Sequence, residues 1–136
     1  MKAIFPAFAA GLLIAAMPAT AAAPAPDAKA EAKLAKALAG RVPGKPVSCI
    51  QLHSIDSSEI FDHTAIVYHV GGTLYVNRPT SGLASLTNDD ILVLKTSLSQ
   101  LCNVDVIHLI DRGSHMPDGF VGLGEFVPYT KVKQGH

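Results

Sequence analysis

The chain has 136 residues, a length that one domain of ordinary size accounts for. Hydrophobic residues make up 49% of it and the formal net charge is zero, but the charge is unevenly distributed. Residues 27–45 carry five basic and two acidic side chains, whereas residues 46–130 carry three basic and nine acidic ones. An acidic domain without tryptophan argues against nucleic-acid binding, which depends on neutralising phosphates.

The first 21 residues have the layout of a secretory signal peptide. A single early charge at Lys2 precedes an apolar run from Ala9 to Met17, and a proline and small residues follow. Peptidase sites need small residues at the third and first positions before the cut, so we expect cleavage after Ala21. An uncleaved anchor is the alternative, because the apolar run approaches the roughly 20 residues that span a bilayer. After cleavage we expect no stable membrane insertion.

Residues 22–45 are predicted to form a Pro/Ala linker and then one short helix. The stretch "DAKAEAKLAKALAG" begins at Asp27, a good N-cap, and ends at Gly40, a residue type that terminates helices. Leu34 and Leu38 give the helix a narrow apolar stripe, which is too weak for stable binding to a membrane surface. We expect this helix either to lie on the domain or to trail from it.

Residues 46–130 are predicted to form the β domain, with residues 131–136 as a tail. The clearest element is "TAIVYHVGGTLYVNRP", two alternating runs joined by Gly71 and Gly72. A two-residue hairpin of this kind needs positive φ at both glycines and places Tyr68 opposite Tyr75. The other expected strands lie in "PVSCIQL", "EIF", "ILVLKTS", "VDVIHLID" and "GFVGLGEFVPYT".

The fold class that these runs indicate is mainly β. Short connections without helical segments between the strands favour antiparallel pairing. Several strands are apolar on both sides, as expected when both faces are covered. We therefore predict a small antiparallel barrel or a two-sided sheet of five to six strands, with one short N-terminal helix.

The two cysteines, Cys49 and Cys102, are predicted to form a disulfide. A bacterial periplasm is kept oxidising, so two cysteines of a secreted chain tend to pair with each other. A free nucleophilic thiol would need nearby cations or a helix N-terminus, whereas Cys102 is followed by Asp105. The bridge would join distant parts of a small domain.

Histidines and aspartates provide the alternative site. None of the six histidines has the tight spacing of a zinc site, but His69 and His108 could meet across a sheet with Asp105 or Asp111. The stretch "HSIDSSEIFDH" holds serine, histidine and aspartate, yet the chain lacks a G-x-S-x-G elbow and such residues are common in turns. We therefore assign no catalytic, cofactor-binding or metal-binding residue and expect no cofactor.

Four stretches together resemble a known family: "LAGRVPGKPVSCIQL", "IVYHVGGTLYVNRP", "LCNVDVIHLID" and "GFVGLGEFVPYT". They are similar to small secreted proteobacterial proteins of the sphingomonad type, a family of unknown function. The resemblance covers residues 34–130. It implies secretion and a β fold, and it implies no activity for any residue.

The sequence thus favours a non-enzymatic, periplasmic or secreted β-domain protein. We expect it to act by binding or as a structural component of the cell envelope, with an envelope protein or a small ligand as its partner. The alternative is a metal-binding or hydrolytic protein whose histidines and aspartates converge.

Overall fold

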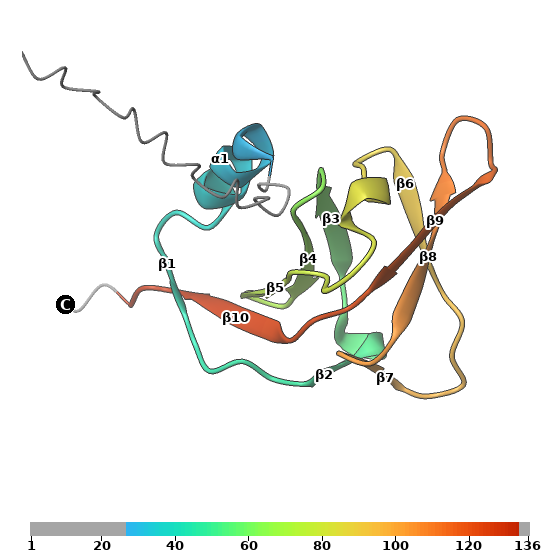
Figure 1. Cartoon of the computed structure of the whole chain (residues 1–136). Coiled ribbons are helices and arrows are strands. Elements are labelled where there is room, and N and C mark those ends of the chain that lie inside the picture. The colour runs from blue at the N-terminus through green and yellow to red at the C-terminus, as the bar shows by residue number, and fades with distance from the viewer. Residues whose placement is uncertain (1–26, 134–136) are drawn as a thin grey trace, which may run out of the picture.

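The computed structural model describes residues 27–133 (Figure 1). The predicted signal peptide with its cleavage after Ala21, the linker before Asp27 and the terminal His136 lie outside the described residues. In chain order the elements are α1 (Ala28–Ala37), β1 (Arg41–Pro43), β2 (Cys49–Gln51), η1 (Leu52–Ser54), β3 (Ser57–Phe61), β4 (Ala65–Val70), β5 (Thr73–Asn77), η2 (Leu83–Ser85), β6 (Asp90–Leu94), β7 (Gln100–Cys102), β8 (Val106–Asp111), β9 (Pro117–Gly122) and β10 (Phe126–Lys131).

The strands form three antiparallel sheets. One has five strands in the order β1-β10-β5-β4-β3, one has three in the order β6-β8-β9, and β2 pairs with β7. The mainly β prediction is confirmed, but ten short strands replace the expected five to six. One reason is that β1, which the sequence analysis placed in the segment of linker and helix, pairs along its whole length with β10.

The two larger sheets pack face to face and do not close into a barrel. On one side β9 continues through a short bend into β10, so a single run of chain passes from one sheet to the other (Figure 1). On the other side the sheets end in β3 and β6, which do not pair with each other. Of the two predicted architectures, the sheet covered on both faces is the one observed.

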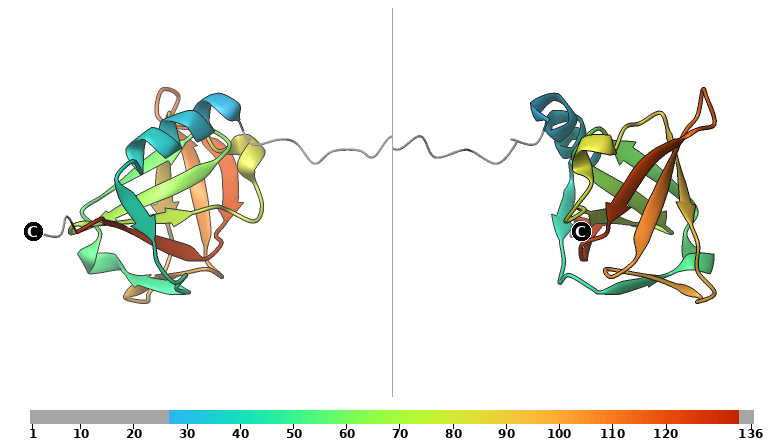
Figure 2. Two further views of the ribbon diagram at one scale, coloured as in Figure 1. Left: turned by 90° about the vertical axis from the view of Figure 1, so that its left-hand side faces the viewer. Right: turned by 45° about the vertical axis from the view of Figure 1, so that its right-hand side comes forward.

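Strand β4 explains why this sheet is apolar on both faces. Ile66 and Tyr68 point into the core between the two larger sheets, together with residues of β8 and β10. Ala65 and Val67 point the other way and pack under α1, which buries Leu34 against them. The helix therefore docks on the five-stranded sheet (Figure 2).

The helix begins and ends as its sequence indicates. The Oδ1 atom of Asp27 accepts hydrogen bonds from the backbone N–H groups of Lys29 (3.0 Å) and Ala30 (3.4 Å), and Gly40 has a φ of +75°. Both guanidinium N–H groups of Arg78 donate to the Glu31 carboxylate, at 2.5 and 3.2 Å. These hydrogen bonds lower the pKa of Glu31 and raise that of Arg78. Both side chains are partly exposed, so the pair adds little stability.

The predicted hairpin is present, with Val70 opposite Thr73 and Tyr68 opposite Tyr75. The expectation of positive φ at both glycines is wrong, because Gly71 has a φ of +57° and Gly72 lies outside the left-handed region. One class of two-residue hairpin turn, type II′, has positive φ only at its first central residue. A glycine is therefore required at position 71 and not at position 72.

The Tyr68 hydroxyl is buried in the core between the sheets and has no hydrogen-bond partner among the described residues. The residue is 4% exposed, and burial raises the pKa of its phenol. Replacing Tyr68 with phenylalanine keeps the ring beside Phe126, 5.8 Å away between centroids, and removes the unpaired group. We expect Tyr68→Phe to raise the free energy of unfolding by about 1 kcal/mol in urea denaturation.

The matched control for this substitution is Tyr75→Phe, at the position directly opposite on β5. Tyr75 is only partly buried, so loss of its hydroxyl should change the free energy of unfolding by less than about 0.5 kcal/mol. A less stable Tyr68→Phe variant would contradict the prediction and show that the hydroxyl has a partner.

Candidate functional site

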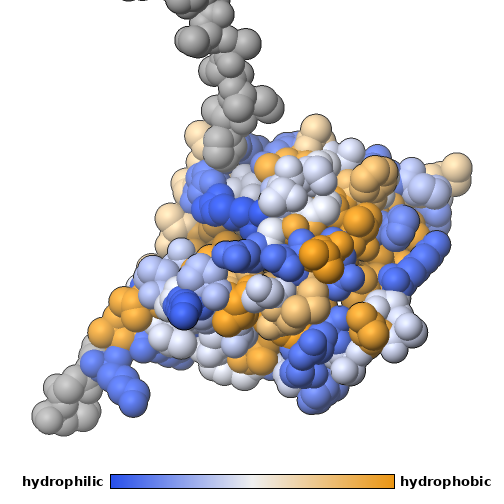
Figure 3. Space-filling view, turned by 60° about the horizontal axis from the view of Figure 1, so that its bottom comes forward, coloured by the Kyte–Doolittle hydropathy of each residue, from blue (hydrophilic) through white to orange (hydrophobic). Residues whose placement is uncertain are grey.

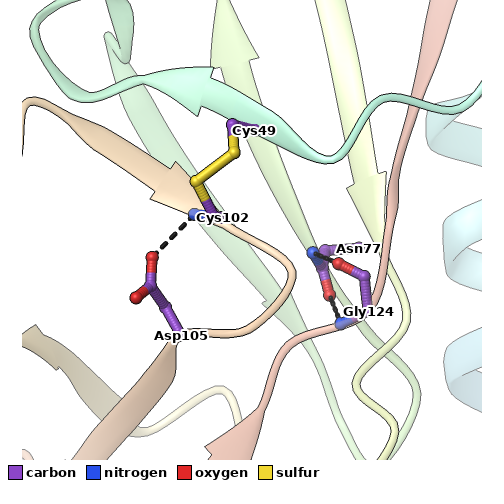
Figure 4. Close-up of a disulfide and its surroundings, with 5 residues drawn as sticks. All are labelled: Cys49, Asn77, Cys102, Asp105 and Gly124. Carbon is purple, nitrogen blue, oxygen red and sulfur yellow. Dashed lines mark hydrogen bonds between the residues drawn. A yellow bond between two sulfur atoms is a disulfide. The ribbon is translucent and has the colours of Figure 1, made fainter.

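The predicted disulfide joins Cys49 on β2 to Cys102 on β7 (Figure 4). The two residues are direct cross-strand partners. The N–H of Asn103 donates to the carbonyl of Ser48 at 2.8 Å, so the cysteines occupy the neighbouring pair without hydrogen bonds, where opposite side chains lie closest. The bridge thus fastens the small β2-β7 sheet across the base of the molecule as drawn in Figure 1.

The molecular face seen in Figure 3 is the underside of the view in Figure 1, where β2 and β7 lie. Hydrophobic side chains on it are interspersed with hydrophilic ones. Isolated apolar residues on a surface need no partner to explain them. This face therefore gives no reason to place a binding site on it. The candidate site described below lies on another part of the molecule.

The two aspartates near His108 stabilise turns. The Oδ2 atom of Asp105 accepts a hydrogen bond from the Cys102 N–H at 2.7 Å (Figure 4). The Oδ1 atom of Asp111 accepts from the N–H and the hydroxyl of Ser114, at 2.7 and 2.8 Å, and these bonds lower the pKa of Asp111. Both carboxylates already have local partners, so their positions are explained without a ligand.

The histidines do not come together. His69 lies on β4 with its Nε2 atom 3.9 Å from the Glu59 carboxylate, whereas His108 lies on β8 of the other sheet, between Val93 and Phe120. His108 is exposed and its neighbours Ile107 and Leu109 are buried, so its side chain lies on the outer face. Within residues 27–133 no three histidine, cysteine, aspartate or glutamate side chains are grouped as a metal site would need. The convergence on which the alternative function depends is not observed.

The structure instead has a groove of about 630 Å³ between the free edges of β3 and β6, beside the start of α1. Four consecutive residues of β3, Ser58–Phe61, and three of β6, Asp90–Leu92, line it. Successive side chains of a strand point to opposite faces, so consecutive residues line one groove only where it borders the strand's edge. The backbones of both edge strands therefore face this groove.

One end of the groove is closed by hydrogen bonds between the two edges. The N–H of Asn88, just before β6, donates to Asp62 Oδ1 at 2.6 Å. The N–H of His63 donates to the carbonyl of Leu86 at 2.8 Å. These bonds hold the turn after β3 against the segment before β6. Beyond them, β3 and β6 form no ladder with each other.

The lining of the groove combines an apolar part with many charges. Ile60 and Leu92 pack against the core and Phe61 packs under α1. Within the described part of the chain, no ion pair joins any two of the charged side chains that line it. These side chains are Asp27, Lys29, Lys33, Glu59, Asp62, Asp90 and Arg112.

Asp90 differs from the other charged residues of the lining because it is only 2% exposed. Its Oδ2 atom accepts hydrogen bonds from the N–H and the hydroxyl of Thr87, at 2.8 and 3.1 Å. Its Oδ1 atom is buried and has no hydrogen-bond partner within residues 27–133. The stretch "TNDD" indicated only the start of a strand. The burial of Asp90 could not be predicted from it, because that burial comes from packing between distant segments.

No pattern in the sequence indicated the groove itself. One signal of an edge strand was present, because the exposed Glu59 of β3 is a charged residue of the kind that protects edge strands from aggregation. Across residues 27–133, no helix has the length and apolar character to cross a membrane. Comparison with known proteins finds no matching family model, curated protein or solved structure.

Proposed function

We propose that this chain is a non-enzymatic β-domain protein of the bacterial cell envelope, periplasmic or secreted, that binds an extended segment of a partner protein between β3 and β6. The sequence at the N-terminus supports export, because it has the layout of a signal peptide. The Cys49–Cys102 bridge supports an oxidising compartment, where disulfides persist. The resemblance to small secreted proteobacterial proteins agrees with both.

The observation that carries the binding function is the pair of free strand edges facing one groove. A free edge presents unpaired N–H and C=O groups, and an extended peptide can pair with them as an added strand. A segment laid along β3 would continue the five-stranded sheet. Its side chains would alternate between the apolar part of the groove, at Ile60 and Leu92, and the charged rim.

A metal-binding or hydrolytic function has less support. It was expected to rest on His69 and His108 converging with an aspartate, and these histidines lie in different sheets. None of the described residues that line the groove is a histidine. Backbone pairing is available at the two strand edges that border the groove, β3 and β6.

The prediction that tests this function uses two adjacent serines of β3. Ser58 lines the groove and Ser57 does not, although both are exposed. Peptides would first be selected from a random octapeptide library on the mature protein, residues 22–136. We expect Ser58→Trp, which fills the groove, to weaken their binding at least tenfold, a loss of about 1.4 kcal/mol. The matched Ser57→Trp variant should bind as the wild type does, as measured by calorimetry.

Backbone chemical shifts of the labelled protein would locate the bound peptides, and the changes should centre on β3 and β6. Failure to recover any peptide, or shift changes confined to other strands, would refute the proposal. Residues 22–26 directly precede Asp27, which lines the groove. Peptides that bind only after deletion of residues 22–26 would identify the chain's own segment as the occupant, which would also refute the proposal.

A further inference from the structure

The buried carboxyl group of Asp90 forms no ion pair with any cation in the described residues. The two salt bridges of the described residues do not involve Asp90. The hydrogen bonds from Thr87 reach only one of the two carboxyl oxygens of Asp90. A buried carboxylate without an ion-pair partner is costly, because it has lost water and gained little in return. Because Asp90 lines the groove, a ligand bound there can supply the cation that Asp90 lacks.

The other charged groups of the groove divide by element. Glu59 and Asp62 lie on β3 and the turn that follows, on the strand side together with Asp90. Lys29 and Lys33 come from α1, and Asp27 is the N-cap residue of that helix. Arg112 also lines the groove, directly after β8, and its N–H donates to the carbonyl of Asp89 at 2.9 Å. Three carboxylates therefore face the groove from the strands and the turn after β3.

We infer that the groove selects extended segments that place a lysine or arginine side chain beside Asp90. This inference rests on the proposed function and adds to it the chemical class of the partner. A peptide paired with the edge strands is held by its backbone, so one of its side chains can be directed at a fixed point of the lining. A cation at that point faces Asp90, with Glu59 and Asp62 on the same strand side.

The attraction does not require direct contact with Oδ1, which lies below the surface. An opposite charge within roughly 4–6 Å still attracts a carboxylate. Water and salt screen a charge at the edge of the core less than one on the open surface. A single well-placed cation can therefore change the affinity measurably.

The closing experiment selects peptides from the random octapeptide library in parallel on the wild type and two variants. Asp90→Asn removes the charge and keeps an oxygen that can accept from Thr87. Asp89→Asn changes the net charge equally at the adjacent, exposed position outside the groove. We expect lysine or arginine to be enriched at one peptide position with the wild type and Asp89→Asn, and not with Asp90→Asn.

The affinity measurement uses the best arginine-containing peptide and its citrulline analogue, which keeps the shape and removes the charge. Citrulline should weaken binding to the wild type and to Asp89→Asn about tenfold, and to Asp90→Asn less than about twofold. An equal loss in all three proteins would overturn the assignment to Asp90. Thermal unfolding of each variant confirms that it is folded.

The two proposals fail in different ways. Peptides that bind at β3 and β6 with no preference for a basic residue would refute this inference and leave the proposed function standing. Absence of any peptide at these strands would refute both. Basic peptides whose shift changes map to another surface would show that the acidic domain attracts cations only in general, which also overturns the inference.

Discussion

Replacing both Cys49 and Cys102 with alanine is expected to lower the free energy of unfolding by about 4 kcal/mol in the chain-entropy account of disulfides. The two cysteines are 53 positions apart, so the bridge closes a long loop and removes many conformations from the unfolded chain. Small domains are stable by only about 5–15 kcal/mol, so this loss is a large share of the total. Urea denaturation at constant pH measures it.

Wild-type protein in reducing buffer is the matched control, because the bridge is opened there without a change of sequence. It should unfold close to the urea concentration at which the double alanine variant unfolds. If the double variant were as stable as the oxidised wild type, the prediction would be wrong. The β2-β7 ladder and the buried Ile50 and Leu101 would then be sufficient to hold this end of the molecule.

Local patterns predicted the elements of this fold better than their arrangement. The hairpin of β4 and β5 was found in its correct register because glycines and alternating side chains lie within one short stretch. The helix was found because its capping residues are adjacent to it. The three residues of β1 carry no strand pattern, since their pairing depends on β10, almost 90 positions later.

The groove could not be predicted for a related reason. A strand is an edge only because no other strand pairs with it, and that is decided by the order of β3 and β6 in their sheets. The sequence of β6 indicates a strand whether or not it is an edge. Asp90 similarly occurs in a polar stretch typical of turns, and only the packing of distant segments buries it. The disulfide was predictable because two cysteines allow a single pairing.

The second large effect on stability is expected from Asn77. Its side chain bonds to the bend between β9 and β10, where the chain passes from one sheet to the other. The residue ends β5 and is fully buried. Its Nδ2 group donates to the carbonyl of Gly124 at 2.7 Å, and its Oδ1 atom accepts from the Gly124 N–H at 2.9 Å (Figure 4). Gly124 lies between β9 and β10, where no described strand pairs with the backbone. The asparagine amide takes the place of a partner strand.

The Asn77→Ala variant is expected to lose about 3 kcal/mol of unfolding free energy, because it leaves a buried N–H and a buried C=O unpaired. Substitution of Gly124 would not be an equivalent test, since a Cβ there would lie 2.5 Å from the carbonyl oxygen of Arg78. The matched control is Asn103→Ala, in the turn after β7, because the Asn103 side chain forms no hydrogen bond with another described residue. It should change stability by less than about 0.5 kcal/mol.

The size of the Asn77 effect decides how the two sheets are held together on the side away from the groove. If Asn77→Ala is as mild as Asn103→Ala, the bend is stable without the amide, and packing of Phe126 and Leu123 in the core holds the sheets there. If Asn77→Ala loses about 3 kcal/mol of unfolding free energy, hydrogen exchange of the Gly124 N–H should be faster in this variant than in the wild type. The β9–β10 bend would then be fixed by polar contacts, whereas β3 and β6 are the edges at which we propose that a partner strand pairs.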